Sequence, residues 1–302
     1  MKTPVAFLIF NRPDTTEKVF EAIRQAQPPK LLVVADGARS DRLNEAEKCQ
    51  ATRAIIDRVD WECEVLTNYS DVNLGCKTRV SSGLNWVFDH VEEAIILEDD
   101  CLPDPSFFLF CEKLLNYYRE DERIMVISGD NFQLGRKRTD YSYYFSRYNH
   151  CWGWATWKRA WQYYDLEMKL WQEIRGSLEY ILQKPRAVRY WNKVFQASYD
   201  GIIDSWDYQW TYSCWIQNGL TILPNVNLVS NIGFGTEGTH TTSNNSPVAK
   251  LPTEEMYFPL RHPPFVIRNA EADEFTQKTL FDSSASDRLI KKAKKILSKK
   301  FY

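Results

Sequence analysis

The stretch IILEDDCLPDPSFF (residues 95–108) runs from a strand-like aliphatic segment into three consecutive acids. A turn with two prolines follows, and two phenylalanines then begin a helical pattern. Three adjacent like charges repel one another and contribute nothing to the packing of a strand. The acids therefore need an explanation beyond the fold. They are Glu98, Asp99 and Asp100.

One explanation is a solvated turn whose acids cap the following helix. Asp104 already supplies that cap, however, and Pro105 suits the first helical position. Side chains alternate along an extended strand, so we expect Glu98 and Asp100 on one face and Asp99 on the other. The second explanation is a site for Mg²⁺ or Mn²⁺, which takes one or two protein carboxylates and completes its shell with phosphate oxygens.

The segments around this stretch alternate between strand-like and helix-like patterns. Their alternation predicts an α/β fold with a doubly wound, mostly parallel sheet flanked by helices. The expected strands are residues 4–10, 31–34, 63–67, 94–97, 124–128 and 220–228, and the expected helices are residues 15–27, 41–57, 80–91 and 105–119.

Polar residues follow three of these strands directly. Asn11-Arg12, Asp36-Gly37 and the three acids each come at a strand end, and ligands of open α/β sheets bind beyond the carboxyl ends of the strands. We therefore expect all three groups on one rim. The chain has neither a P-loop nor a G-x-G-x-x-G motif, which argues against P-loop kinases and dinucleotide dehydrogenases.

The composition narrows the class of protein. A net charge of −2 gives no basic field for nucleic acid. The seven cysteines form no C-x-x-C pair, which indicates a reducing cytoplasmic setting. The apolar run at residues 4–10 is too short for a signal sequence or a membrane span. Nine of the eleven tryptophans fall between Trp152 and Trp215, a density typical of a core or of a sugar-stacking surface.

Four segments in this order resemble glycosyltransferases of the GT-A fold, in particular the N-acetylglucosaminyltransferase I type and related bacterial proteins. They are FNRPD (10–14), ADG (35–37), DVNLGCKTRVSSGLNWVFD (71–89) and residues 95–108. The resemblance covers residues 4–130 and continues more loosely to about residue 241.

Three regions of the chain follow from this layout. We expect residues 1–130 to form a nucleotide-sugar-binding half with a Rossmann-like sheet. Residues 131–246 would form the aromatic-rich, acceptor-side and catalytic half of the same domain. Residues 247–302 are irregular and end in a basic amphipathic helix.

The resemblance implies roles for five donor-side residues. Arg12 would contact the nucleotide base or the diphosphate, and Asp36 would hydrogen-bond uracil. Asp100 would bind a metal that bridges the diphosphate. Glu98 and Asp99 would face the donor sugar and the ribose.

The catalytic base has two candidates in the segment YDGIIDSWDYQW (199–210). Asp207 resembles the family's Trp-Asp catalytic acid and is preferred. Asp204, three residues earlier, is the reserve; alternatively, it is only the cap of a helix that contains Asp207. His240, in GFGTEGTHTT (233–242), would ligate the metal or bond a phosphate.

Two further pairs of residues each allow two interpretations. Trp152 or Trp154, around Gly153, would stack on a sugar ring or else belong to the core. Lys77 and Arg79 would approach the diphosphate or else form a solvated pair.

Together these features predict a metal-dependent glycosyltransferase that uses Mn²⁺ or Mg²⁺. We expect it to move a sugar, with inversion, from a UDP-linked donor to a glycan or lipid-linked acceptor. One alternative is a sugar-phosphate nucleotidyltransferase, although FNRPDTT lacks that class's glycine-rich loop. The other is a carbohydrate-binding protein, which leaves the acidic cluster unexplained. The basic helix at residues 287–302 predicts either contact with an anionic membrane surface or a solvated helix docked on a cytoplasmic protein.

Overall fold

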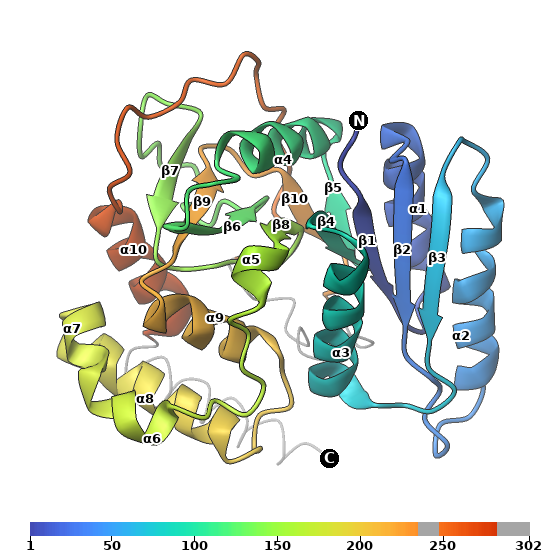
Figure 1. The fold of residues 1–302 in the computed structure, drawn as a ribbon, viewed down its shortest axis with the longest axis horizontal. Helices are drawn as coiled ribbons and strands as arrows, with labels where there is room; N and C mark the ends of the chain where they lie inside the picture. The colour runs from blue at the N-terminus through green and yellow to red at the C-terminus, as the bar shows by residue number, and fades with distance from the viewer. Residues whose placement is uncertain (235–247, 283–302) are drawn as a thin grey trace, which may run out of the picture.

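The computed structural model describes residues 1–234 and 248–282. Its centre is one mixed sheet with the strand order β3-β2-β1-β4-β8-β6-β9-β7 (Figure 1). The strands are β1 (Val5–Ile9), β2 (Lys30–Ala35), β3 (Glu64–Tyr69), β4 (Glu93–Glu98), β6 (Ile124–Ser128), β7 (Tyr143–Ser146), β8 (Trp154–Trp157) and β9 (Leu220–Pro224).

Most of this sheet is parallel. β3, β2, β1 and β4 pair in parallel, as do β6 and β9. β8 lies antiparallel between β4 and β6, and β7 is antiparallel to β9. The predicted α/β class with a mostly parallel sheet is confirmed, and the expected strands of the first half lie at their expected positions.

Helices cover both faces, as expected for strands whose two faces are both apolar. One face carries α1 (Pro13–Ala26), α2 (Glu45–Ala54) with η1 (Ile56–Arg58), and α4 (Pro105–Tyr117). The other face carries α3 (Gly75–His90), α5 (Lys158–Trp161), α8 (Pro185–Tyr199) and α9 (Asp207–Ile216). The smaller elements are α6 (Trp171–Ile174), η2 (Arg175–Ser177), α7 (Leu178–Leu182), α10 (Ala270–Thr276) and η3 (Gln277–Phe281).

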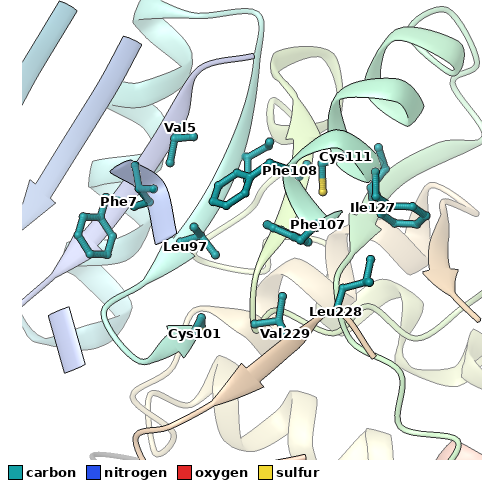
Figure 2. Close-up of a cluster of buried hydrophobic side chains, with 14 of the residues drawn as sticks. Val5, Phe7, Leu97, Cys101, Phe107, Phe108, Cys111, Ile127, Leu228 and Val229 are labelled. Atoms are coloured by element: carbon teal, nitrogen blue, oxygen red, sulfur yellow. The ribbon is translucent and has the colours of Figure 1, made fainter. Parts of the chain in front are cut away.

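The helix after the acidic cluster anchors one of the two cores. Figure 2 shows Phe107, Phe108 and Cys111 of α4 beside Val5 and Leu97 of the sheet. Burying side chains of this size contributes roughly 1.5–3 kcal/mol each. Asp104 caps α4 as predicted, since its Oδ1 accepts a hydrogen bond from the Ser106 N–H at 2.9 Å. The acids before it are therefore not needed for this helix.

Three boundaries differ from the sequence prediction. α3 begins at Gly75 rather than at residue 80, because a glycine with φ +78° lets the chain turn directly into the helix. The expected strand 220–228 ends at Pro224, and a separate β10 (Val229–Asn231) pairs antiparallel with β5 (Cys101–Pro103). The chain bends at Trp152-Gly153, where Gly153 has φ +73°, and then enters the sheet as β8, a strand that the sequence analysis did not predict.

No helix within residues 1–234 and 248–282 is both long and apolar enough to cross a bilayer. The predicted basic helix at residues 287–302 lies outside the described residues.

Candidate functional site

A cavity of about 380 Å³ opens at the carboxyl ends of β1, β2 and β4. The start of α3, the residues before α9 and the end of β10 complete its wall. The three strand-end groups share this cavity, so the prediction of one polar rim is confirmed. The lining includes eight of the expected site residues: Arg12, Asp36, Arg79, Glu98, Asp99, Asp100, Asp204 and Asp207.

Arg12 holds two of the three clustered acids. Its Nη1 donates to Asp100 Oδ2 at 2.8 Å, and its Nη2 donates to Asp99 Oδ1. Asp99 also accepts a hydrogen bond from the Phe10 N–H at 3.2 Å. The expectation that Asp99 faces away from Asp100 is therefore wrong. β4 ends at Glu98, so the strand's alternation stops before the two aspartates, which lie in a turn.

The second oxygen of Asp100, Oδ1, accepts a hydrogen bond from the Cys101 thiol at 3.4 Å. It also lies 3.5 Å from Asn231 Nδ2, at the limit of a hydrogen bond. The backbone at Gly233 covers the Arg12 side of the same carboxylate, since an added Cβ there would lie 2.1 Å from Asp100 Oδ2. Asn231, at the end of β10, and Gly233, just after it, thus fix the position of the Asp100 carboxylate, although both are far along the chain.

Negative charge is in excess in this cluster. Burial raises the pKa of Glu98, and the charges of Asp100 and Asp99 raise it further. Burial likewise raises the pKa of Asp99, although Arg12 opposes that shift. Burial disfavours the charge of Arg12, but Asp99 and Asp100 outweigh burial and raise its pKa. One guanidinium therefore faces three carboxyl groups, an arrangement that favours a further cation.

Asp36 organises the loop between β3 and α3. Its Oδ1 accepts hydrogen bonds from the N–H groups of Gly37 and Leu74, both at 2.9 Å. Its Oδ2 accepts from Asn73 Nδ2 and the Gly75 N–H, both at 3.1 Å. Burial nevertheless raises the pKa of Asp36. Both oxygens are used by the protein, so Asp36 shapes this wall of the cavity.

Asp204 reaches the same wall from the other half of the chain. α9 begins at Asp207 with Trp206 before it, so the prediction of Asp204 as the cap of that helix is wrong. Its Oδ1 instead accepts a hydrogen bond from the Lys77 N–H in the first turn of α3, at 3.3 Å. The contact of Lys77 with this site residue is therefore made by its backbone N–H.

Arg79 is buried at the strand ends. Its Nε donates to the carbonyl oxygen of Ala35 at 3.1 Å, and its Nη2 donates to Asn68 Oδ1 at 2.7 Å. Burial lowers its pKa. Arg79 lines the cavity while satisfying the ends of β2 and β3, and it does not form the expected solvated pair with Lys77.

Asp207 lies at the first position of α9, where the helix dipole favours a negative charge. Its Oδ1 accepts a hydrogen bond from the Ser205 hydroxyl. Burial is the main cause of the raised pKa of Glu98, and the charge of Asp207 adds to it. A candidate base therefore lines the same cavity as the acidic cluster.

The two candidate tryptophans have different environments. Trp152 lines the cavity and contacts Phe234 edge-on at 5.4 Å between ring centroids. Trp154 is 0% exposed and stacks on Trp206 at 5.6 Å. Trp154 therefore packs as a core residue, and Trp152 is the tryptophan that a ligand can reach.

The polar lining residues that the sequence analysis missed include Asn73, Ser205, Asn231 and Arg39. Their place in the cavity depends on local turns or on neighbours distant in the chain. Asn231 ends β10, a strand that the sequence analysis did not predict. His240 lies outside the described residues. Within the described part of the chain, no group of three or more His, Cys, Asp or Glu side chains is arranged to hold a metal by itself.

No protein-family model and no curated protein sequence matches this chain. Solved structures with partial likeness include the galactosyltransferase LgtC in complex with donor and acceptor sugar analogues. It is 10% identical, with 58% of this chain and 66% of LgtC covered and a TM-score of 0.35. A 4-diphosphocytidyl-2C-methyl-D-erythritol synthase from Anaerococcus prevotii is 11% identical over 58% of this chain and 77% of that chain, with a TM-score of 0.32.

A UDP-glucose pyrophosphorylase in complex with UDP-glucose is 12% identical, with 48% of this chain and 62% of the pyrophosphorylase covered and a TM-score of 0.27. The match spans just under two thirds of LgtC and of the pyrophosphorylase. All three TM-scores are below 0.5, so the functional proposal depends on the site residues themselves.

Proposed function

We propose that this protein is a metal-dependent, inverting glycosyltransferase that transfers a sugar from a nucleotide-diphosphate donor, UDP-linked, to a hydroxyl of a glycan or lipid-linked acceptor. The observation that carries the proposal is the presence of two acidic groups in one cavity. Glu98 and Asp100 lie at the end of β4 with Arg12, and Asp207 lines the same cavity from the start of α9. The first group suits a cation and a diphosphate, and the second suits a base.

The donor set fits a hard divalent cation that is shared with a ligand. Asp100 Oδ1 accepts only a weak thiol hydrogen bond from Cys101 and a 3.5 Å contact from Asn231 among the described residues, and Glu98 lines the same cavity. Mg²⁺ and Mn²⁺ commonly take one or two carboxylates and fill the remaining positions with phosphate oxygens and water. When bound, such an ion would neutralise charge on the departing diphosphate. His240 remains a proposed further ligand.

The nucleoside would lie at the end of the cavity formed by Phe10, Asp36, Arg39 and Asn73. The Arg39 guanidinium lies 5.5 Å from the Phe10 ring centroid, which supports a flat, aromatic-compatible surface there. Asp36 accepts hydrogen bonds from the Asn73 side-chain amide and from the Leu74 and Gly75 N–H groups, which border this end. We therefore assign Asp36 to nucleotide binding through the loop it shapes.

Transfer requires a base that takes the proton of the acceptor hydroxyl. We assign this role to Asp207, whose Oδ1 accepts a hydrogen bond from the Ser205 hydroxyl at the start of α9. Trp152 supplies an apolar surface on which a sugar ring could stack. Arg12 offers positive charge to the diphosphate. Asp204 is the reserve base, although its contact with α3 favours a structural role.

The decisive experiment titrates UDP into the protein with and without Mn²⁺, using wild type, Asp100→Asn and Asp104→Asn. Asp104 is the matched control, because it lies four residues away and only caps α4. Metal-dependent UDP binding that only Asp100→Asn abolishes supports the proposal. UDP binding that ignores both the metal and Asp100→Asn would overturn it.

A donor screen then separates the enzyme classes. Hydrolysis or transfer of a UDP-sugar, reduced by Asp207→Asn, is expected for a glycosyltransferase. Release of pyrophosphate from a nucleoside triphosphate and a sugar 1-phosphate would instead identify a nucleotidyltransferase.

A further inference from the structure

Arg12 holds a positive charge beside the proposed cation position at Asp100 Oδ1. Its guanidinium pairs with Asp99 and with Asp100 Oδ2, and it is only 19% exposed at the side chain. The two carboxylate side chains are 3% and 8% exposed. Water screens such pairs poorly, so the charge of Arg12 strongly affects anything that approaches Asp100.

The chain also holds this guanidinium in place. An added Cβ at Gly233 would lie 2.6 Å from Arg12 Nη1 and 2.1 Å from Asp100 Oδ2, so the backbone lies directly on the pair. The Ile232 N–H donates to the Asp100 carbonyl oxygen at 2.8 Å and fixes that backbone. Arg12 therefore remains close to any ligand of Asp100.

This arrangement has opposite effects on a bare cation and on a cation that arrives with a diphosphate. A bare divalent cation at Asp100 Oδ1 is repelled by the guanidinium that already neutralises the same carboxylate. A diphosphate brings negative charge that pairs with Arg12 and removes the repulsion. Linked binding of this kind is reciprocal, so each ligand increases the affinity for the other.

We infer that Arg12 couples the two ligands: its charge weakens the binding of a free divalent cation, and a diphosphate that pairs with Arg12 strengthens the binding of that cation. The inference rests on the proposed function for the identity of the diphosphate. A purely structural Arg12 makes a different prediction, because its removal would then weaken the binding of every ligand or unfold the chain.

The test measures Mn²⁺ affinity by electron paramagnetic resonance and by calorimetry in wild type, Arg12→Gln and Arg24→Gln. Arg24→Gln is the matched control, because Arg24 forms an ion pair with Asp60 on the surface. Each protein is titrated with Mn²⁺ alone, with Mn²⁺ plus UDP, and with Mn²⁺ plus pyrophosphate. Circular dichroism checks that each variant is folded.

Arg12→Gln is expected to bind Mn²⁺ alone about tenfold more tightly than wild type. The gain in Mn²⁺ affinity that UDP or pyrophosphate gives should shrink by a similar factor, and Arg24→Gln should match wild type. A folded Arg12→Gln that binds Mn²⁺ alone no better than wild type overturns the inference.

Arg12→Lys keeps the positive charge but cannot bridge two carboxylates. It replaces Arg12→Gln in the test if that variant fails to fold. Because the lysine no longer bridges both carboxylates, we expect Mn²⁺ alone to bind more tightly than in wild type, and affinity equal to or below wild type would overturn the inference. The proposed function fails separately, if wild type binds neither UDP nor pyrophosphate with Mn²⁺, because the comparison of Mn²⁺ alone does not depend on a nucleotide.

Discussion

The carboxylate of Asp204 accepts a hydrogen bond from the backbone N–H of Lys77 at 3.3 Å. This contact ties the loop before α9 to the first turn of α3, two segments more than a hundred residues apart in the sequence. Asp207, three residues further on, instead accepts a hydrogen bond from its neighbour Ser205. The two acids therefore differ in what their removal should disturb.

Asp207→Asn is expected to lower the rate constant of transfer by about 10²–10⁴-fold, because the amide cannot take a proton. Donor affinity should be nearly unchanged. Asp204→Asn should lower the rate far less and should mainly reduce the melting temperature, because it weakens the tie to α3. Transfer kinetics and thermal unfolding of the two variants provide the comparison. A larger loss of rate in Asp204→Asn than in Asp207→Asn would instead identify Asp204 as the base and give Asp207 the structural role.

Binding of nucleotide with a cation should strengthen with rising pH. The pKa values of Glu98 and Asp99 are raised by burial and by neighbouring carboxylates, so both groups are partly protonated in the empty site near neutrality. A cation favours the ionised forms, so affinity should rise from about pH 5.5 to 8, with release of protons. Calorimetry in buffers of different ionisation enthalpy measures both quantities. Glu98→Gln should flatten the profile, and a flat wild-type profile would contradict the assignment.

The contribution of Asp130 to the free energy of unfolding of the ligand-free protein should fall with rising pH. Asp130 is 0% exposed, its Oδ1 has no partner among the described residues, and burial raises its pKa well above the usual carboxyl value. A raised folded-state pKa means that ionisation costs stability as pH rises above the unfolded-state value of about 4. Asp130→Asn should therefore be more stable than wild type at pH 8, and this advantage should shrink at pH 5. Urea unfolding at both values checks the sign.

Trp154→Ala should destabilise the fold by about 3–5 kcal/mol, because it removes a fully buried ring that stacks on Trp206. Trp152→Ala should cost less stability and should weaken binding of the sugar ligand about fivefold, since one stacking contact is worth about 1 kcal/mol. Unfolding curves and Michaelis constants separate the two. Equal losses of stability with no effect on binding would remove Trp152 from the site.

Gly233→Ala should displace the Arg12–Asp100 pair, because its Cβ has no room beside Asp100 Oδ2. Metal-dependent UDP affinity should fall about tenfold while the fold persists. Gly176→Ala is the control, since an added Cβ there meets nothing within 4 Å. Unchanged affinity in Gly233→Ala would show that Asp100 tolerates the displacement.

The first half of the fold could be read from local patterns. β1, β2 and β4 are short, mostly apolar runs followed by polar turns, and α1 and α3 each bury an apolar face. The position of Arg12, Asp36 and the acidic cluster at one rim follows from the parallel topology alone. These predictions depend on rules that act within about thirty residues.

The remaining features depend on contacts between distant residues. Nothing local indicates that Asp204 meets Lys77 or that Gly233 lies on Asp100, because both depend on how the second half packs onto the first. β8 was missed because its tryptophans are buried on both faces of a four-residue strand, so they give no alternating pattern. The orientation of Asp99 was mispredicted because the strand ends one residue before it.

The antiparallel β8 separates β4 from β6 in the sheet, although β6 comes first in the chain. Residues 1–130 thus contain a strand that cannot reach its own sheet until residues 154–157 have been added. A truncated chain ending near residue 130 would leave the edge of β4 exposed and β6 without its β8 partner, which are conditions that promote aggregation. During synthesis, the sheet that carries the acidic cluster would therefore be completed only after the tryptophan-rich segment has been added.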